Sequence, residues 1–133
     1  MFVGFYQRSL DTKGRLLVPA KVLRKLPAEG GQVSLYVMLL GDHLGLFPAE
    51  SFHDRLQEQR TRGFTDDNQL TAMLSLAEEC TLDANNRLRL TPKHLEEAGL
   101  DRDVVLVGSG DHLEIWSPDA VDRMRRQYLG ADR

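Results

Sequence analysis

The chain has 133 residues, of which 28% are charged, and its formal net charge is −3 at pH 7. This length suits one ordinary domain or two very small ones, and no apolar stretch approaches the roughly 20 residues of a membrane span. The start, MFVGFYQRSL, lacks the features of a signal peptide, and the single cysteine, Cys80, cannot form an internal disulfide. We therefore expect a cytoplasmic globular protein without a membrane segment.

The charge is unevenly distributed along the chain. Residues 1–25 contain six basic side chains and one acidic residue, a balance of +5. The balance is −7 over residues 26–86 and −1 over residues 87–133. A local basic face can bind phosphate while an acidic remainder limits unspecific binding. A solvated basic surface without a ligand is the alternative interpretation.

The first predicted unit begins with a short strand that leads into a turn of the pattern Asp-x-x-x-Arg, from Asp11 to Arg15. Gly14 precedes the arginine, and glycine adopts the positive φ of a tight turn freely. An apolar strand is predicted at 16–18, and a short helical segment opened by Pro19 follows it.

Two further strands complete the sheet-forming part of this unit. The segments VSLYVMLL at 33–40 and LGLFP at 44–48 are rich in residues that favour strands. Gly41 and Asp42 separate them and are typical of a hairpin turn. A closing helix then ends the unit by residue 64.

A connecting helical segment is predicted at 65–76. Thr65 or Asp66 provides the N-cap of its helix. We expect its apolar side chains to form part of the core or an oligomer contact, and these are Leu70, Met73, Leu74 and Leu76.

The first pattern returns later in the chain. SLDTKGRLLVPAK and TLDANNRLRLTPK align at a constant offset of 72, with these identical pairs: Leu10 and Leu82, Asp11 and Asp83, Arg15 and Arg87, Leu16 and Leu88, Lys21 and Lys93. Gly14 aligns with Asn86, and asparagine is one of the few other residues that tolerate a positive φ. The tetrapeptide GDHL also recurs, at 41–44 and 110–113. We therefore predict a duplicated fold in which GDHL is a hairpin corner formed twice.

The second unit is predicted to repeat the order of the first. An apolar strand at 88–90 precedes a helical segment with Pro92, and strands follow at 103–110 and 113–117. Ser117 is the expected N-cap of the closing helix, because a proline and an aspartate follow it. One face of this helix is expected to pack on the sheet through Val121, Met124, Tyr128 and Leu129.

Catalytic and metal sites are poorly supported. The pairs Asp42–His43 and Asp111–His112 are candidate acid–base groups, but adjacent residues in a strand point to opposite faces. No nucleophile motif accompanies them, and the histidines and Cys80 lack the spacing of metal ligands. We expect no metal, no cofactor and no enzymatic activity, and Cys80 is predicted to be a small buried apolar residue.

The arginine turns are the remaining candidate site. In one interpretation, each Asp–Arg pair is a brace within its turn, which at a solvated site contributes only about 0–1 kcal/mol. In the other, the basic side chains of the turns and strands contact nucleic acid, because a two-stranded ribbon fits the major groove of DNA. The residues concerned are Lys13, Arg15, Arg87 and Arg89.

These segments resemble the MraZ family. The first 26 residues are similar to the opening of that family through Met1-Phe2-x-Gly4, Leu10-Asp11-x-Lys13-Gly14-Arg15 and Pro19. LAEECTLDANNRLRLTP is similar to its second motif and IWSPDAV to its closing helix, so the resemblance covers residues 1–129. Two positions depart from the pattern, because Asn86 replaces the usual glycine and Thr91 stands where Pro19 stands in the first copy.

The resemblance implies an α+β fold of the AbrB/SpoVT-like swapped-hairpin class. In this class two half-barrel repeats with flanking helices would form a pseudo-dimer within one chain. The expected division is a first repeat with its closing helix at 1–64, a connecting helical segment at 65–76, and a second repeat with a C-terminal helix at 77–133.

The resemblance also implies a bacterial transcription factor. Members bind direct repeats of double-stranded DNA in the promoter of the division and cell-wall gene cluster, usually as repressors. They assemble as ring-shaped homo-oligomers and associate with the nucleoid. The DNA-contacting positions carried over are Lys13, Arg15 and Arg87, and charge and position add Arg8, Lys21 and Arg89. The turns would be shaped by Asp11, Gly14, Asp83 and Asn86.

Two other functions remain as alternatives. An antitoxin-like binder of the same fold class would need a segment that wraps a toxin, and the short end GADR offers little of that. An oligomeric interaction protein without a DNA role would use the Asp–Arg pairs only as braces.

Overall fold

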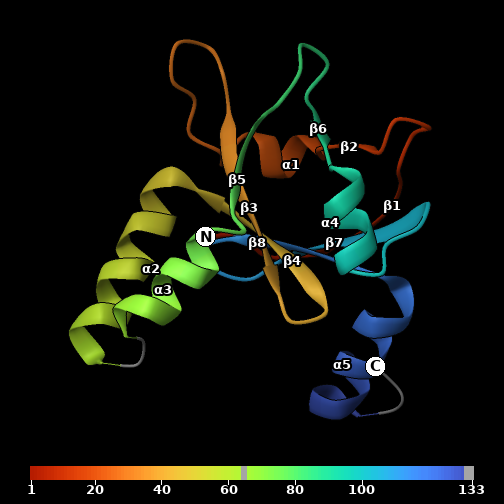
Figure 1. Ribbon diagram of the computed structural model, residues 1–133. Coiled ribbons are helices and arrows are strands. Elements are labelled where there is room, and N and C mark those ends of the chain that lie inside the picture. The colour runs from red at the N-terminus through yellow and green to blue at the C-terminus, as the bar shows by residue number, and fades with distance from the viewer. Residues whose placement is uncertain (64–65, 131–133) are drawn as a thin grey trace.

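The chain folds as two successive copies of one order of strands and helices, which a computed structural model describes for residues 1–63 and 66–130 (Figure 1). The first copy contains β1 (Phe5–Ser9), β2 (Arg15–Leu17), α1 (Ala20–Leu23), β3 (Ser34–Leu40), β4 (His43–Pro48) and α2 (Ala49–Arg62). The second copy follows α3 (Asp67–Leu74) and contains β5 (Glu78–Thr81), β6 (Arg87–Arg89), α4 (Pro92–Glu97), β7 (Asp103–Gly108), β8 (Leu113–Trp116) and α5 (Pro118–Leu129).

The strands of the two copies pair with each other. Six of them form an antiparallel sheet in the order β1-β7-β8-β4-β3-β5. In this order β1 of the first copy lies against β7 of the second, and β5 of the second lies against β3 of the first. The strands β2 and β6 form a separate antiparallel ribbon. The combination of helices with antiparallel strands confirms the predicted α+β class.

The main core joins the ribbon to one face of the six-stranded sheet. Leu16 and Leu88 of the ribbon are fully buried, in one apolar cluster with Val37, Leu44 and Ile115 of the sheet. Burying a leucine side chain contributes about 1.5–3 kcal/mol. The inward face of the ribbon is therefore anchored, while its outward face is left to solvent.

Helices cover the other face of the sheet in two groups. Phe52 of α2 and Met73 of α3 pack with Phe47 of β4. Val121 of α5 packs with Trp116 of β8. The pairing of β4 with β8 lies between the two groups (Figure 1). Among the helices of residues 1–63 and 66–130, none combines the length and the apolarity needed to cross a bilayer.

Two predicted N-caps are confirmed. The side chain of Asp66 accepts a hydrogen bond from the backbone of Gln69, whose side chain bonds the backbone of Asp66 in return. Ser117 accepts a hydrogen bond from the Ala120 N–H at 3.2 Å. Thr65, the other predicted start, lies outside the described residues, as does the predicted unit boundary at residue 64.

Two predicted apolar faces are wrong at their ends. Tyr128 and Leu129 are 73% and 55% exposed, whereas Val121 is buried as predicted. The last turn of α5 extends away from the strands (Figure 1), and neither side chain belongs to an apolar cluster of the described residues. Leu76 is also 44% exposed, because it lies after the end of α3, while Leu70 within that helix is buried.

Candidate nucleic-acid interface

The ribbon of β2 and β6 presents a basic outer face. Its register pairs Arg15 with Arg89, Leu16 with Leu88, and Leu17 with Arg87. Successive side chains of a strand alternate between faces, so the two buried leucines direct the remaining residues outward. The outward set consists of Arg15, Leu17, Arg87 and Arg89.

One carboxylate organises the turn before β2. Asp11 Oδ1 accepts hydrogen bonds from the backbone N–H groups of Lys13 and Arg15, both at 2.9 Å. Asp11 Oδ2 accepts a hydrogen bond from Arg15 Nε at 2.6 Å. The backbone hydrogen bond from Arg15 is the main cause of a lowered pKa of Asp11, and the guanidinium adds to it against partial loss of hydration. The carboxylate therefore stays ionised and holds the arginine in one orientation.

The second copy repeats this geometry before β6. Asp83 Oδ1 accepts the backbone N–H groups of Asn85 and Arg87 at 2.9 Å each, and Oδ2 accepts Arg87 Nε at 3.1 Å. The backbone hydrogen bond from Arg87 is again the main cause of a lowered pKa of Asp83. Gly14 has a φ of 73° and Asn86 a φ of 61°. The prediction that Asn86 preserves the turn is confirmed.

The two turns are bonded to each other. Leu90 N–H donates to the Gly14 carbonyl at 2.9 Å, and Val18 N–H donates to the Asn86 carbonyl at 3.1 Å. Arg87 Nη1 also lies 3.7 Å from Asp11 Oδ2, the carboxylate of the other turn. The ribbon therefore holds Arg15 and Arg87 in a fixed mutual arrangement rather than on independent loops.

The other basic residues predicted to contact DNA lie on different elements of the structure. Lys13 in the first turn, Arg89 on β6 and Lys21 on α1 are exposed. Arg8 belongs to β1 of the six-stranded sheet, outside the ribbon, where it donates to the Gln7 carbonyl at 2.8 Å. The structure therefore unites Arg15, Arg87 and Arg89 on one face and leaves Arg8 apart.

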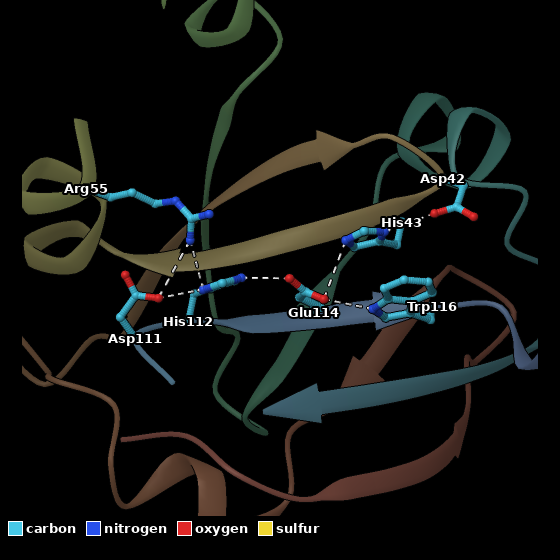
Figure 2. A network of polar contacts seen from close by, with 7 residues as sticks. All are labelled: Asp42, His43, Arg55, Asp111, His112, Glu114 and Trp116. Carbon is cyan, nitrogen blue, oxygen red and sulfur yellow. Dashed lines mark hydrogen bonds and ion pairs between the residues drawn. The ribbon is translucent and has the colours of Figure 1, made fainter. Parts of the chain in front are cut away.

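A second polar cluster, which the sequence did not predict, crosses the pairing of β4 with β8 (Figure 2). Glu114 accepts a hydrogen bond from Trp116 Nε1 at 2.9 Å. Its carboxylate oxygens lie 2.8 Å from His112 Nε2 and 3.4 Å from His43 Nε2. Arg55 of α2 approaches the same cluster, with Nη1 3.3 Å from His112 Nδ1. We call these five residues the seam network.

The prediction that neighbouring aspartate and histidine side chains point apart is wrong. His43 Nδ1 lies 3.0 Å from Asp42 Oδ1, and His112 Nδ1 lies 2.7 Å from Asp111 Oδ1. Both aspartates belong to hairpin turns rather than strands, so strand alternation does not separate the pairs. His43 also stacks on Trp116 with ring centroids 3.8 Å apart. These contacts make the histidines a brace across the seam.

The seam network favours charged groups despite its burial. Burial disfavours the charged imidazole of His43, but hydrogen bonds to Glu114 and Asp42 outweigh it and raise its pKa. Burial likewise disfavours the Glu114 carboxylate, yet the hydrogen bonds from His112, His43 and Trp116 hold its pKa far below the usual range. An ion pair between His43 and Glu114 therefore forms at mildly acidic pH.

One sequence signal could have indicated this network. The offset of 69 that relates the GDHL copies also relates Gly45 to Glu114, and these two residues face each other in the β4–β8 register. A Cβ at Gly45 would lie 2.5 Å from Phe47 Cε2. A position without a side chain in one copy therefore faces the carboxylate in the other.

Known proteins resemble this chain over nearly its whole length. A family model described as "MraZ protein, putative antitoxin-like" matches residues 1–72 and again residues 73–129, which confirms the internal duplication. The chain is similar to proteins named "Transcriptional regulator MraZ" from three bacteria. The relative from Corynebacterium efficiens is 38% identical over 124 residues, covering 90% of this chain and 83% of the relative. That from Heliobacterium modesticaldum is 35% identical (88% and 81% covered), and that from Corynebacterium kroppenstedtii is 31% identical (96% and 89% covered).

Proposed function

Because the chain belongs to the MraZ family of transcriptional regulators, we propose that it is a sequence-specific DNA-binding protein whose β2–β6 ribbon contacts the operator. The observation that carries this proposal is the pair of aspartate-held arginines, Arg15 and Arg87, on the outer face of one rigid ribbon. A two-stranded ribbon fits the major groove, where arginine can pair with O6 and N7 of guanine.

The hydrogen bonds of the turns support this role. Asp11 uses only Nε of Arg15, and among the described residues the two Nη atoms of that arginine have no hydrogen-bond partner. A side chain that is already oriented loses less conformational freedom when it binds. Arg89, Lys13 and Lys21 are exposed around it and would contact phosphates, which position the protein on the duplex. Arg8 is the weakest of the predicted DNA contacts because it lies outside the ribbon.

The strand pairing supports the finer fold assignment. The exchange of β1 and β5 between the copies is the feature expected of the AbrB/SpoVT-like swapped-hairpin class. In this proposal, the repeats at 1–64 and 77–133, linked by 65–76, act as a pseudo-dimer within one chain. The ribbon is where the two repeats together form a single DNA-contacting element.

The regulatory role extends what the family resemblance implies. The protein would bind direct repeats in the promoter of the division and cell-wall gene cluster as a ring-shaped homo-oligomer at the nucleoid, and would repress that promoter without catalysis. A ring would also explain how the small basic face of each protomer could give tight binding to DNA. After one protomer binds, the next contacts are effectively intramolecular, so weak contacts multiply.

Fluorescence anisotropy of a duplex from the region upstream of the gene tests this function. Wild-type protein should bind the native repeats and not a shuffled duplex of equal length and charge. Arg15→Ala should weaken binding by roughly 1–3 kcal/mol, or about 5- to 150-fold per contact. Arg60→Ala is the matched control, because it removes the same charge from an exposed position of α2.

Two results would contradict the proposal. Equal binding to native and shuffled duplexes would favour an interaction protein or an antitoxin-like binder without operator recognition, the alternative to which the family description itself points. Equal losses for Arg15→Ala and Arg60→Ala would remove the ribbon as the contact surface and leave Asp11–Arg15 as a brace.

A further inference from the structure

The outer face of the ribbon breaks the symmetry of the two copies at one position. The offset of 72 relates Arg15 to Arg87, but it relates Leu17 to Arg89. The register places Arg89 opposite Arg15 at one end of the ribbon and Leu17 opposite Arg87 at the other. One end therefore carries a pair of arginines, and the other carries an arginine beside an apolar side chain.

The arginine pair favours an electron-rich ligand. Like charges directly opposite in an antiparallel pair destabilise it. Asp11 neutralises Arg15, whereas Arg89 is exposed and has no hydrogen-bond or ion-pair partner among the residues that the structure describes. A phosphate or the acceptor edge of guanine between the two guanidinium groups would relieve this repulsion.

The other end favours a different ligand. Leu17 is 55% exposed, although Leu16 beside it is fully buried. A single exposed leucine is ordinary, but this one shares its face with three arginines and lies opposite Arg87, which Asp83 holds through a 3.1 Å contact. Its side chain offers no donor to a phosphate. The apolar group that the major groove presents is the C5-methyl group of thymine.

We propose that Leu17 is a specificity-determining residue that contacts the C5-methyl group of a thymine. This inference rests on the proposed function of the ribbon. It assigns the two ends of the ribbon to different chemistry, with Arg15 and Arg89 on guanine or phosphate and Leu17 on thymine. The ribbon therefore has a preferred orientation on DNA, although its fold is nearly two-fold symmetric.

The test compares the native upstream duplex with the same duplex containing deoxyuridine in place of thymidine, which lacks only the methyl groups. Wild-type protein should bind the deoxyuridine duplex about fourfold more weakly for each ribbon engaged, the equivalent of one buried methyl-sized group. Leu17→Ala should lose a similar factor on the thymidine duplex and should not distinguish the two duplexes. Leu76→Ala is the matched control, because Leu76 is 44% exposed outside the ribbon.

A second variant tests the same inference through a gain of DNA affinity rather than a loss. Leu17→Arg makes the two ends alike, so it should bind DNA more tightly and with a steeper salt dependence, by about 0.9 in the logarithmic slope for each added phosphate contact. It should also lose the preference for thymidine over deoxyuridine. Leu76→Arg adds the same charge outside the ribbon and should keep that preference.

Three outcomes would overturn the inference. If Leu17→Ala still prefers thymidine as wild type does, the methyl groups act elsewhere or through DNA shape. If Leu17→Ala changes the sedimentation coefficient of the free protein, Leu17 is a contact between protomers. If wild type binds neither duplex, the proposed function itself fails. The first two outcomes leave that function standing whenever Arg15→Ala weakens binding more than Arg60→Ala does.

Discussion

The aspartates of the ribbon turns act on the backbone and on a side chain at once. Asp11 and Asp83 each accept two backbone N–H groups through Oδ1 and a guanidinium Nε through Oδ2. The same carboxylate therefore closes the turn and orients the arginine. The two interpretations of the Asp11–Arg15 pair, a brace and a DNA contact, are compatible because Asp11 holds this arginine through Nε alone.

Substitutions of Asn86 test whether the turn before β6 requires a positive φ. Its φ of 61° suits glycine, is tolerated by asparagine, and costs other residues about 1–2 kcal/mol. Asn86→Gly should leave the free energy of unfolding nearly unchanged, whereas Asn86→Ala should lower it by about 1 kcal/mol. Urea unfolding of both variants measures the difference. An equal effect of the two substitutions would show that the backbone conformation does not determine this position.

Residue patterns predicted the local features and missed those that depend on pairing between the copies. The pairing of Asp11 with Arg15 and the positive φ of Asn86 could be predicted from the sequence, because the residues that form each turn lie within four positions of one another along the chain. The seam network was not, since Glu114 meets His43 only after β4 pairs with β8. The exposure of the side chains at the end of α5 could not be predicted either, because the spacing of apolar residues in a helix does not indicate where the neighbouring sheet ends.

The pairing of β4 with β8 joins the two copies at the middle of the six-stranded sheet. The helices of the two groups lie on either side of it (Figure 1), and the side chains of the seam network cross it (Figure 2). The stacking of His43 on Trp116 is matched by that of His112 on Phe47, with ring centroids 4.5 Å apart. This pairing therefore combines apolar ring contacts with a partly buried ion pair.

The seam network predicts a pH dependence of stability. The pKa of Glu114 is lowered from 4.5, so its contribution is present above that pH and is lost only in stronger acid. The pKa of His43 is raised from 6.5, so its contribution is full below that pH and is lost as the pH rises through the raised value. The ion pair should therefore stabilise the fold most between about pH 4.5 and 6.5.

His43→Phe measures this contribution, because it keeps a ring against Trp116 and removes the charge. The difference in Tm between wild type and His43→Phe should be largest near pH 5.5 and should shrink by pH 8.5. His53→Phe, at an exposed position of α2, is the control and should show no such trend. A difference for His43→Phe that is constant across this range would contradict the assignment of the ion pair.

The exchange of strands makes the two copies one unit. Neither copy completes its own part of the sheet, because β1 and β5 each pair with a strand of the other copy. The ribbon likewise takes one strand from each copy. Under the proposed function, this topology gives each chain one DNA-contacting ribbon rather than two independent ones, and assembly of chains would repeat that ribbon along DNA.

The proposed ring predicts a strong dependence on the number of operator repeats. Linking contacts can raise apparent affinity by roughly 10²- to 10⁴-fold without new interactions. A duplex with three native repeats should therefore bind far more tightly than one with a single native repeat and two shuffled ones of equal length. Both affinities should fall as salt rises, because phosphate contacts release counterions. Equal affinities for the two duplexes would argue against simultaneous binding by several protomers.

Photo-cross-linking would show whether the ribbon lies against DNA. A photoreactive residue, p-benzoylphenylalanine, would replace Arg89 on the ribbon or Arg60 on α2, both exposed. If the ribbon contacts the operator, only position 89 should cross-link to a labelled native duplex. Unlabelled native duplex should suppress these cross-links, and a shuffled duplex should not. Cross-links from position 60 and none from position 89 would contradict a contact at the ribbon, and would move the DNA-contacting surface to the helical side of the sheet.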